Sequence, residues 1–209
     1  MTVGGKVLVA ATTNEHKIAE LSAIARKLGY TVISRTEAGV PDFEIEETGA
    51  TFEENSMLKA AAVFDALGGK AAVIADDSGL EVDALDGAPG VLSARFANAS
   101  GSRVSQDSAN NAKLLRLMEN VPREKRTAKF VSVITCLLPG RPPIVCRGEI
   151  EGRLHFEETG IQGFGYDPLF VPSGYSSSFG LFDPIHKNAI SHRARALAML
   201  AEKLAAETL

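Results

Sequence analysis

The sequence has no surplus of basic residues and no long apolar run. Its 26 acidic side chains outnumber 22 Lys and Arg, for a formal net charge of -4, whereas proteins that bind long nucleic acid usually carry a basic excess. The N-terminal apolar run extends only from Val7 to Ala11, too short for a signal-peptide core, and no later run has the length of a membrane span. We therefore expect a soluble, cytoplasmic protein that binds neither long nucleic acid nor a membrane.

Cysteine is scarce as well. Cys136 and Cys146 are the only two, and the sequence has neither a Cys-x-x-Cys pair nor histidines at zinc-binding spacing. They flank "LPGRPP", which is typical of a hairpin turn, and pairing of Leu138 with Ile144 would place the two cysteines opposite each other. In a reducing cytosol this pattern favours two buried thiols over a disulfide.

The remaining composition is that of a globular protein. In 209 residues, 45% are hydrophobic and 23% are charged, which is enough for one sizeable core or two lobes that share one. The sequence contains no internal repeat, no low-complexity block and no linker-like segment. We expect a single domain over residues 1–209, with a cleft.

Apolar periodicity predicts the helices, and short apolar runs predict the strands. The expected helices cover 15–28, 52–67, 106–118 and a segment from Ser191 onward, and the expected strands cover 6–11, 31–36, 71–75, 80–85 and the two arms of a hairpin, 129–138 and 143–152. Thr51 and Glu54 have capping-box spacing, and Gly29 stands where a helix C-terminal cap belongs. The early alternation of strands and helices, interrupted by a hairpin, predicts an α/β fold around a mixed sheet.

The stretch "LVAATTNEHKIAEL" places Lys17 in the first turn of a predicted helix, where the positive end of the helix dipole disfavours a cation. The unpaired amides of that turn form an anion site, and helical side chains lean back toward it. A phosphate bound there would supply the counter-ion for Lys17, with Thr12, Thr13 and Asn14 as further donors. Alternatively, Thr12 and Glu15 form a capping box and Lys17 is solvated.

The last predicted helix repeats this pattern. Ser191 is a good N-cap residue, but His192 and Arg193 occupy the first turn, and Lys187 lies just before them. An exposed first-turn cation costs only ~0.3–1 kcal/mol, but residues that break a local rule concentrate at functional sites. Two such helices favour a polyanion as the ligand.

Carboxylates gather in two stretches. In "IADDSG", Asp76 and Asp77 end a predicted buried strand, the position where α/β proteins place ligand sites. Neighbouring side chains of an extended chain point in opposite directions, so one can face a metal and the other can anchor a neighbouring loop or cation. Glu46 and Glu47 add carboxylates, and a set of oxygen ligands alone suits Mg²⁺. Alternatively, "DDSG" is a structural turn.

Two further features have both a structural and a functional interpretation. On the helix at 52–67, Phe52, Asn55 and Lys59 share a face. Such a polar stripe is usually solvated, and it becomes functional only if the glutamate loop before it borders the same cleft. In "GFGYDP", two glycines flank Phe164, whose ring either stacks on a nucleotide base or packs in the core.

With these segments the chain resembles the inosine triphosphate pyrophosphatase family, which removes non-canonical purine nucleoside triphosphates. The segments that carry the resemblance, nearly end to end, are "TTNEHK", "FEENSMLKA", "ADDSGLEVDALDGAPGVLSARFA", "GFGYDP" and "KNAISHRARAL". It implies a long mixed sheet with flanking helices, two lobes around a central nucleotide cleft, a homodimer and Mg²⁺ dependence. One departure is Leu181, where family members often carry a glutamate shortly after the position of Phe179.

The resemblance also implies roles for the matching residues. Asp77 is implied as general base and metal ligand, with Glu47 as the second metal carboxylate and Glu46 as its adjacent alternative. The residues implied to bind the substrate are Thr12, Thr13, Asn14, Glu15, His16 and Lys17 at the triphosphate, Lys59 near the phosphates, Ser78 in contact with the substrate, and Phe164, Gly165, Tyr166, Asp167, Lys187, His192 and Arg193 around the base.

The implied reaction is attack of a water, which Asp77 orients and deprotonates, on the α-phosphorus of the triphosphate. The products are a nucleoside monophosphate and pyrophosphate, and Mg²⁺ with the cations neutralises the phosphate charge. Hypoxanthine and xanthine carry a carbonyl where adenine carries an amino group, so a donor such as Arg193 would pair with the former and oppose the latter. A buried polar group left unpaired costs ~1–3 kcal/mol, enough to disfavour ATP.

Two other functions compete with this interpretation. A related pyrophosphatase type takes thymidine or uridine triphosphate and usually has an arginine pair in its N-terminal phosphate loop, which "TTNEHK" lacks. A nucleotide-binding sensor without turnover would gain little from several nearby carboxylates unless a metal is present. The carboxylates therefore favour an enzyme.

Overall fold

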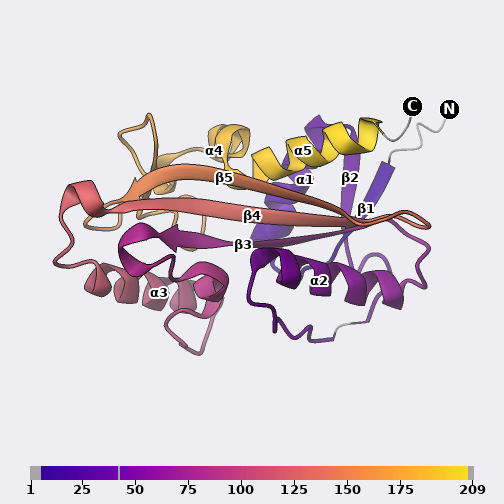
Figure 1. Cartoon of the computed structure of the whole chain (residues 1–209), viewed down its shortest axis with the longest axis horizontal. Coiled ribbons are helices and arrows are strands. Elements are labelled where there is room, and N and C mark those ends of the chain that lie inside the picture. Colours follow the sequence, from indigo (N-terminus) through magenta and orange to yellow (C-terminus); the bar gives the residue numbers. More distant parts are fainter. Residues whose placement is uncertain (1–5, 42, 207–209) are drawn as a thin grey trace. The chain divides into compact units, whose positions relative to one another are not determined.

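A computed structural model describes residues 6–41 and 43–206. Positions 1–5, 42 and 207–209, which the predicted domain also includes, lie outside these ranges. The sheet has six strands in the order β2-β1-β3-β4-β5-β6, with parallel and antiparallel pairs, and helices accompany it (Figure 1). The predicted α/β fold with a mixed sheet is confirmed. None of the helices in the described ranges has the length and apolar character needed to cross a membrane.

The elements follow the expected alternation along the chain. The strands are β1 (Lys6–Ala10), β2 (Tyr30–Ser34), β3 (Val73–Val82), β4 (Thr127–Leu137), β5 (Ile144–Leu154) and β6 (Phe170–Pro172). The helices are α1 (Glu15–Lys27), α2 (Phe52–Ala66), α3 (Arg103–Leu117), α4 (Pro184–Ile190) and α5 (His192–Ala206). The capping box of Thr51 and Glu54 is present at the start of α2, as predicted.

β3 corrects the prediction of two separate strands at 71–75 and 80–85. It is a single strand of 10 residues, so Asp76 and Asp77 lie within it rather than at its end, and "DDSG" is not a turn. The polar run favours a break in the strand, because buried strands are usually apolar throughout. Here the polar side chains have partners on both sides of the strand, so the extended backbone continues through them.

Two helices differ from the prediction, one in its start and one in its existence. α3 begins before residue 106, because the hydroxyl of Ser102 accepts a hydrogen bond from the Ser105 N–H and caps the first turn. α4 was not predicted at all. Asp183 caps it and Pro184 is its first residue, a start signal that a seven-residue helix makes easy to overlook.

The described chain divides into two compact units. Unit 1 comprises Met1–Asp77, Ser132–Gly148 and Arg193–Leu209, and unit 2 comprises Ser78–Val131 and Glu149–His192. The prediction of a single domain with a cleft stays a prediction.

Alternation along the strands of unit 1 builds a core on each face. β1 pairs in parallel with β2 and with β3. Leu8 and Ile74 pack with residues of α1 and α5, whereas Val9 and Val73 pack with residues of α2. Figure 1 shows α2 on the opposite side of these strands from α5. Any side chain of β3 in this unit therefore faces either α1 and α5 or α2, according to whether its number is even or odd.

Unit 1 also contains the two cysteines. Cys136 and Cys146 are buried, free thiols within the same core cluster as Ile134 and Ile144. The prediction of two buried thiols rather than a disulfide is confirmed.

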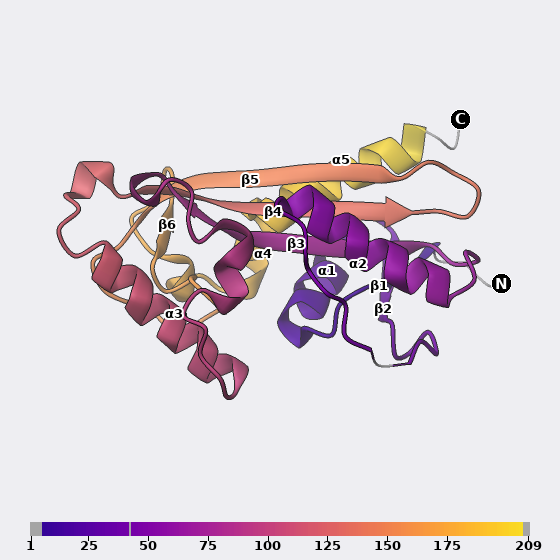
Figure 2. The ribbon, with the colours of Figure 1, turned by 60° about the horizontal axis from the view of Figure 1, so that its bottom comes forward.

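Unit 2 has an aromatic core. The ring centroids of Phe130 and Phe170 lie 4.6 Å apart, those of Phe130 and Phe179 6.3 Å apart, and α3 adds Leu114 to the same cluster. β5 pairs antiparallel with the short strand β6. Figure 2 shows α3 beside the 3-10 segment Gly90–Arg95, against which it packs.

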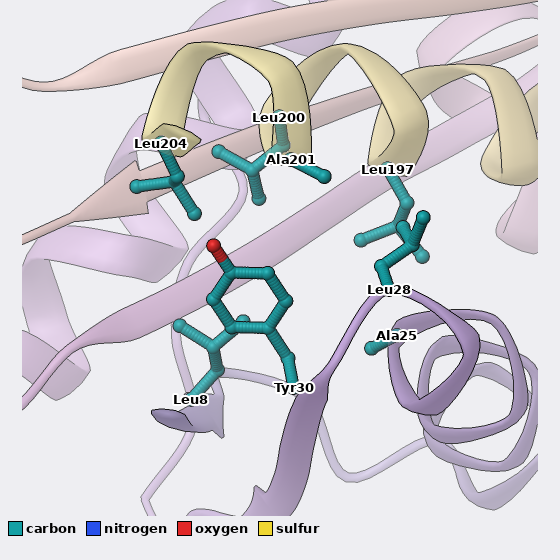
Figure 3. A pocket seen from close by; sticks show the side chains of 8 residues that line it. All are labelled: Leu8, Ala25, Leu28, Tyr30, Leu197, Leu200, Ala201 and Leu204. Carbon is teal, nitrogen blue, oxygen red and sulfur yellow. The ribbon is translucent and has the colours of Figure 1, made fainter. Parts of the chain in front are cut away.

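A pocket of unit 1 lies between α1, β2 and α5 (Figure 3). It is small and partly open to solvent, and its lining residues are Leu8, Ala25, Leu28, Tyr30, Leu197, Leu200, Ala201 and Leu204. None of these side chains is charged. The pocket therefore belongs to the packing of the helices and has none of the groups that a triphosphate needs.

Candidate active site

Asp76 and Asp77 lie on opposite faces of β3, as the sequence predicts. Asp76 faces α1 and α5, where its carboxylate contacts Lys17 and Arg193. Asp77 faces α2, where its carboxylate contacts Lys59. Both side chains are buried. Adjacent positions on one strand thus enter two different charge clusters.

Asp76 is the centre of the first cluster. Its Oδ2 lies 2.8 Å from Lys17 Nζ and 3.2 Å from Arg193 Nη2, and its Oδ1 accepts a hydrogen bond of 2.5 Å from the Ser132 hydroxyl. Glu20, one turn after Lys17 on α1, takes the other terminal nitrogen of Arg193. Burial alone would raise the pKa of Asp76, but Arg193 and Lys17 outweigh it and hold that pKa well below its usual range. The carboxylate is therefore ionised at neutral pH.

This cluster explains why Lys17 is tolerated at the start of α1, where the helix dipole disfavours a cation. Asn14, not Thr12, caps the helix by accepting from the Lys17 N–H at 3.2 Å, so the alternative of a Thr12–Glu15 capping box is wrong. The alternative of a solvated Lys17 is also wrong, because its ammonium pairs with Asp76 and burial lowers its pKa. Asp76 is thus a counter-ion for Lys17 from within the protein.

The rest of the predicted phosphate loop lies at the surface. Thr13, Glu15 and His16 are exposed, and Thr12 is half-buried with its hydroxyl accepting from the Asn14 N–H at 3.2 Å. This loop joins β1 to α1 and so stands at the helix N-terminus, where amides and the dipole favour anions.

Asp77, Lys59 and Glu47 form the second cluster. Lys59 Nζ lies 2.5 Å from Asp77 Oδ1 and 3.1 Å from Glu47 Oε1, so the two carboxylates converge on one point. Glu46 is exposed, which favours Glu47 in the choice between these neighbours. Burial raises the pKa of Asp77, although Lys59 opposes it, whereas the pKa of Lys59 is raised because Asp77 and Glu47 together outweigh its own burial.

The second cluster has the donor set for a hard cation. Asp77 Oδ2 is buried, and no described residue donates a hydrogen bond to it. Such an unpaired oxygen fits a ligand atom. The described part of the chain holds no group of three or more His, Cys, Asp or Glu that could bind a metal ion. Two carboxylates alone suit Mg²⁺ bound together with phosphate oxygens and waters, and do not suit a closed protein cage.

Of the two interpretations of the polar face of α2, the solvated stripe does not hold. Asn55 and Lys59 are buried. Asn55 holds the backbone of Gly49 at both ends, accepting from its N–H at 2.8 Å and donating to its carbonyl at 3.3 Å. This contact anchors the loop that carries Glu47 two residues earlier. The glutamate loop therefore borders the same cluster, which was the condition for a functional interpretation.

In unit 2, the predicted base-binding residues gather around the turn at 163–167. Phe164 is half-buried as a residue and is absent from the buried core clusters, so the alternative of a core phenylalanine does not hold. Its N–H donates to Asp167 Oδ2 at 2.8 Å, and the same oxygen accepts from Lys187 Nζ at 2.6 Å. The Lys187 ammonium lies 4.9 Å from the centroid of the Phe164 ring. A flat apolar surface and a buried donor thus stand side by side.

Of the other predicted residues in unit 2, Tyr166 and His192 make contacts with buried parts of the protein, and Ser78 is less buried. Tyr166 is buried and donates to the Ser93 carbonyl at 2.9 Å, and burial raises its pKa. The buried ring of His192 stacks on Phe130, with centroids 4.9 Å apart. Ser78 is half-buried on β3.

Arg193 lies in unit 1, where Glu20 and Asp76 hold its two terminal nitrogens. Its expected role as the donor to a purine carbonyl stays a prediction.

Sequence reasoning missed four residues that support these clusters. They are Glu20 and Ser132 around Asp76, and Asp107 and Asn111 beside Gly165. Glu20 carried a signal, because it lies at i+3 from Lys17 on the same face of α1. The others are joined to their partners only by the folded chain.

The whole chain has close counterparts among known proteins. The Ham1 family model matches residues 8–203. The chain is 47% identical over 198 residues to the "dITP/XTP pyrophosphatase" of Geobacter sulfurreducens, covering 94% of this chain and 96% of that one. It is 45% identical over 196 residues to the protein of the same name from Exiguobacterium sibiricum, covering 92% and 94%. The solved Ham1 protein of Staphylococcus aureus superposes with a TM-score of 0.82 and 41% identity, over 97% of this chain and 100% of that one.

Proposed function

The chain belongs to the Ham1 family, and from this premise we propose that it hydrolyses dITP, ITP and XTP to the nucleoside monophosphate and pyrophosphate. The resemblance drawn from the sequence motifs points the same way. The observation that carries the proposal is the convergence of Glu47 and Asp77 on one point, with one buried oxygen of Asp77 unpaired. A pair of carboxylates at a cationic site fits metal-assisted phosphoryl transfer.

The clusters of unit 1 are proposed to bind the triphosphate. Their three cations, Lys17, Lys59 and Arg193, contact four carboxylates, Glu20, Glu47, Asp76 and Asp77, which leaves one negative charge in excess. Side chains balanced in this way attract a polyanion poorly. The charge balance therefore supports a divalent cation as part of the substrate complex.

Mg²⁺ is the cation we propose, with Glu47 and Asp77 as its protein ligands. When bound there, Mg²⁺ neutralises phosphate charge and the charge that develops on the leaving pyrophosphate. Lys59, which contacts both carboxylates in this structure, would then turn toward the phosphate oxygens as their counter-ion. Lys17 contributes at the start of α1, where its ammonium and the helix amides point the same way.

Asp77 is proposed as the general base. Burial raises the pKa of its carboxyl, which moves it toward the range where a carboxylate accepts a proton from water effectively. Once Lys59 has turned toward the phosphates, Asp77 has two carboxylate oxygens, so that one can hold the metal and the other can accept this proton. The proton leaves water as its oxygen attacks the α-phosphorus, and the bond to pyrophosphate breaks.

The turn at 163–167 in unit 2 is proposed to bind the base. Phe164 offers a ring for stacking, and Lys187 offers a donor beside it. A donor facing the six position pairs with the carbonyl of hypoxanthine or xanthine and opposes the amino group of adenine. Lys187 replaces Arg193 in this role, because it lies next to Phe164 whereas Arg193 is held by Asp76 and Glu20.

A homodimer and a cytoplasmic location complete the proposal. The support for the location is the substrate, since nucleoside triphosphates of the cellular pool are cytoplasmic. The support for the dimer is the resemblance to the inosine triphosphate pyrophosphatase family. Sedimentation of the purified chain tests the dimer directly.

The decisive experiment incubates the protein with Mg²⁺ and each of ITP, dITP, XTP, ATP and dTTP in H₂¹⁸O. We expect pyrophosphate from the first three, with the ¹⁸O label in the monophosphate, since water attacks the α-phosphorus. Label in pyrophosphate would place the attack at the β-phosphorus and overturn the proposed chemistry. Preference for dTTP would indicate a pyrimidine enzyme, and binding without any product would indicate a sensor.

A further inference from the structure

α3 holds Gly165, the central residue of the turn at 163–167, on both sides of its Cα. The Gly165 N–H donates to Asp107 Oδ2 at 2.9 Å, and the Gly165 carbonyl accepts from Asn111 Nδ2 at 3.2 Å. Asp107 and Asn111 are four residues apart on α3 and so share one face of the helix. The two successive peptide units that meet at Gly165 are thus fixed by a single rigid element, one at its donor and the other at its acceptor.

Gly165 directly follows Phe164, whose ring we assign to base stacking. Gly163 and Gly165 have φ of 74° and 61°, so the turn uses left-handed backbone that only glycine adopts readily. Glycine-rich backbone has little stiffness of its own and depends on outside contacts. The peptide unit that carries the Gly165 N–H also contains the Phe164 carbonyl, so fixing it restrains the position of Phe164.

The same constraint reaches Lys187. Asp167 Oδ2 accepts from both the Phe164 N–H and Lys187 Nζ, so a shift of the turn would move this oxygen and the ammonium that it holds. Phe164 and Lys187 then change position together. A contact from α3 to Gly165 can in this way control both the stacking surface and the donor.

Asn111 has a feature that packing does not explain. The side chain is 2% exposed, yet no described residue donates a hydrogen bond to its Oδ1. A buried polar atom without a partner is unfavourable, and a leucine of similar volume would avoid it. The bond from Nδ2 to Gly165 is what an amide supplies here and an apolar side chain cannot.

We propose that Asp107 and Asn111 are positioning residues that set Phe164 and Lys187 for the purine base by clamping the Gly165 peptide. The proposal rests on the proposed function. Neither residue touches the nucleotide, and both act through the turn. Their loss weakens base recognition and leaves triphosphate recognition, which belongs to unit 1, intact.

The test compares Asn111→Leu and Asp107→Ala with the wild type in steady-state hydrolysis of dITP. We expect KM to rise about tenfold, the effect of losing roughly one hydrogen bond, with kcat changed by less than about twofold. Inhibition by inorganic tripolyphosphate, which has no base, should keep the wild-type inhibition constant. Asp107→Asn should restore most of the affinity for dITP, because its amide oxygen still accepts from the Gly165 N–H.

Arg103→Gln is the matched control. Arg103 Nε lies 3.1 Å from Asp107 Oδ1, an i,i+4 ion pair on α3 that this variant breaks while leaving the bond to Gly165 in place. We expect a wild-type KM from it. An equal rise in KM from Arg103→Gln would show that helix stability, not the clamp, is responsible, and would overturn the proposal.

The outcomes separate this proposal from the proposed function. A wild-type protein without hydrolysis of dITP refutes the function itself. An active wild type with unchanged KM in Asn111→Leu and Asp107→Ala refutes only the clamp, as does a parallel loss of tripolyphosphate inhibition. Should Asp107→Ala not fold, as judged by far-UV circular dichroism, Asn111→Leu still decides, because it adds no charge and conserves volume.

Discussion

Asp76 and Asp77 are adjacent residues of the same type, but neutralising them should have different consequences for stability. Asp76 is ionised between Lys17 and Arg193, which hold its pKa well below the usual range. Asp77 has a pKa raised by burial, so the fold favours its neutral form. A folded state that lowers the pKa of a carboxyl is stabilised by the ionised group, and a folded state that raises the pKa is not. Replacement by neutral, isosteric Asn should therefore lower the stability of the folded state at position 76 and not at position 77.

The magnitude for Asp76→Asn follows from what it leaves behind. Lys17 remains partly buried without its carboxylate, and Arg193 keeps only Glu20. Breaking a buried ion pair by removing one partner costs ~3–5 kcal/mol. For a chain of this length that loss corresponds to a Tm lower by about 6–20 °C. Asp77→Asn should stay within about 1 kcal/mol of the wild type, because Lys59 retains Glu47.

The assay is urea unfolding followed by far-UV circular dichroism, since the chain has no tryptophan for fluorescence. Activity on dITP is measured in parallel. We expect Asp77→Asn to fold normally and lose turnover while it still binds dITP. Because the Asp76 contribution is present above its unfolded pKa and lost as pH falls, the difference between Asp76→Asn and the wild type should narrow below pH of about 4. Equal stability of the two variants, or a larger loss in Asp77→Asn, would refute the reasoning.

Three further changes test the proposed site. Glu47→Gln should lower activity at limiting Mg²⁺, and excess Mg²⁺ should restore it. The control is Glu46→Gln at the exposed neighbouring residue, which should show the wild-type dependence of activity on Mg²⁺ concentration. Activity of Glu47→Gln that excess Mg²⁺ does not restore would contradict a metal role. Phe164→Ala should raise KM for dITP by about 10- to 100-fold, the value of one base–aromatic stack, and unchanged KM would place the base elsewhere. Lys17→Ala should weaken inhibition by tripolyphosphate and also lower Tm, because Asp76 loses one of its two cations; a Tm equal to that of the wild type would show that this ion pair is not stabilising.

The sequence predicted the faces of the two aspartates but not their partners. Alternation in an extended chain is a local property, so the division of Asp76 from Asp77 could be read directly. The partners come from far away, since Lys17 lies 59 residues and Arg193 117 residues from Asp76. No local pattern encodes such a pairing. The cations at the helix starts therefore predict an anionic ligand, but the sequence does not indicate that buried carboxylates of the same chain also contact them.

The sequence left two interpretations of the polar face of α2 open for the same reason. A solvated stripe is the usual fate of Asn and Lys on a helix, because burying them without partners is costly. Asn55 and Lys59 avoid that cost through the backbone of Gly49 and through Glu47 and Asp77, all outside the helix. Helix boundaries and the hairpin were predicted better, since periodicity, caps and turns are contained in short stretches.

The charge balance of unit 1 bears on how a triphosphate would be recognised. Lys17, Lys59 and Arg193 each already contact a carboxylate, so an anion must displace one of these contacts before it gains one. Displacing Asp76 would leave Lys17 without this carboxylate and Arg193 with Glu20 as its remaining partner. Displacing Lys59 instead frees Asp77 and Glu47, whose convergence suits a divalent cation. The exchange is favourable only when metal and phosphate arrive together, because either alone leaves charges unpaired. Under the proposed function, the Asp76 cluster is therefore the fixed part of the site and the Asp77 cluster the part that rearranges.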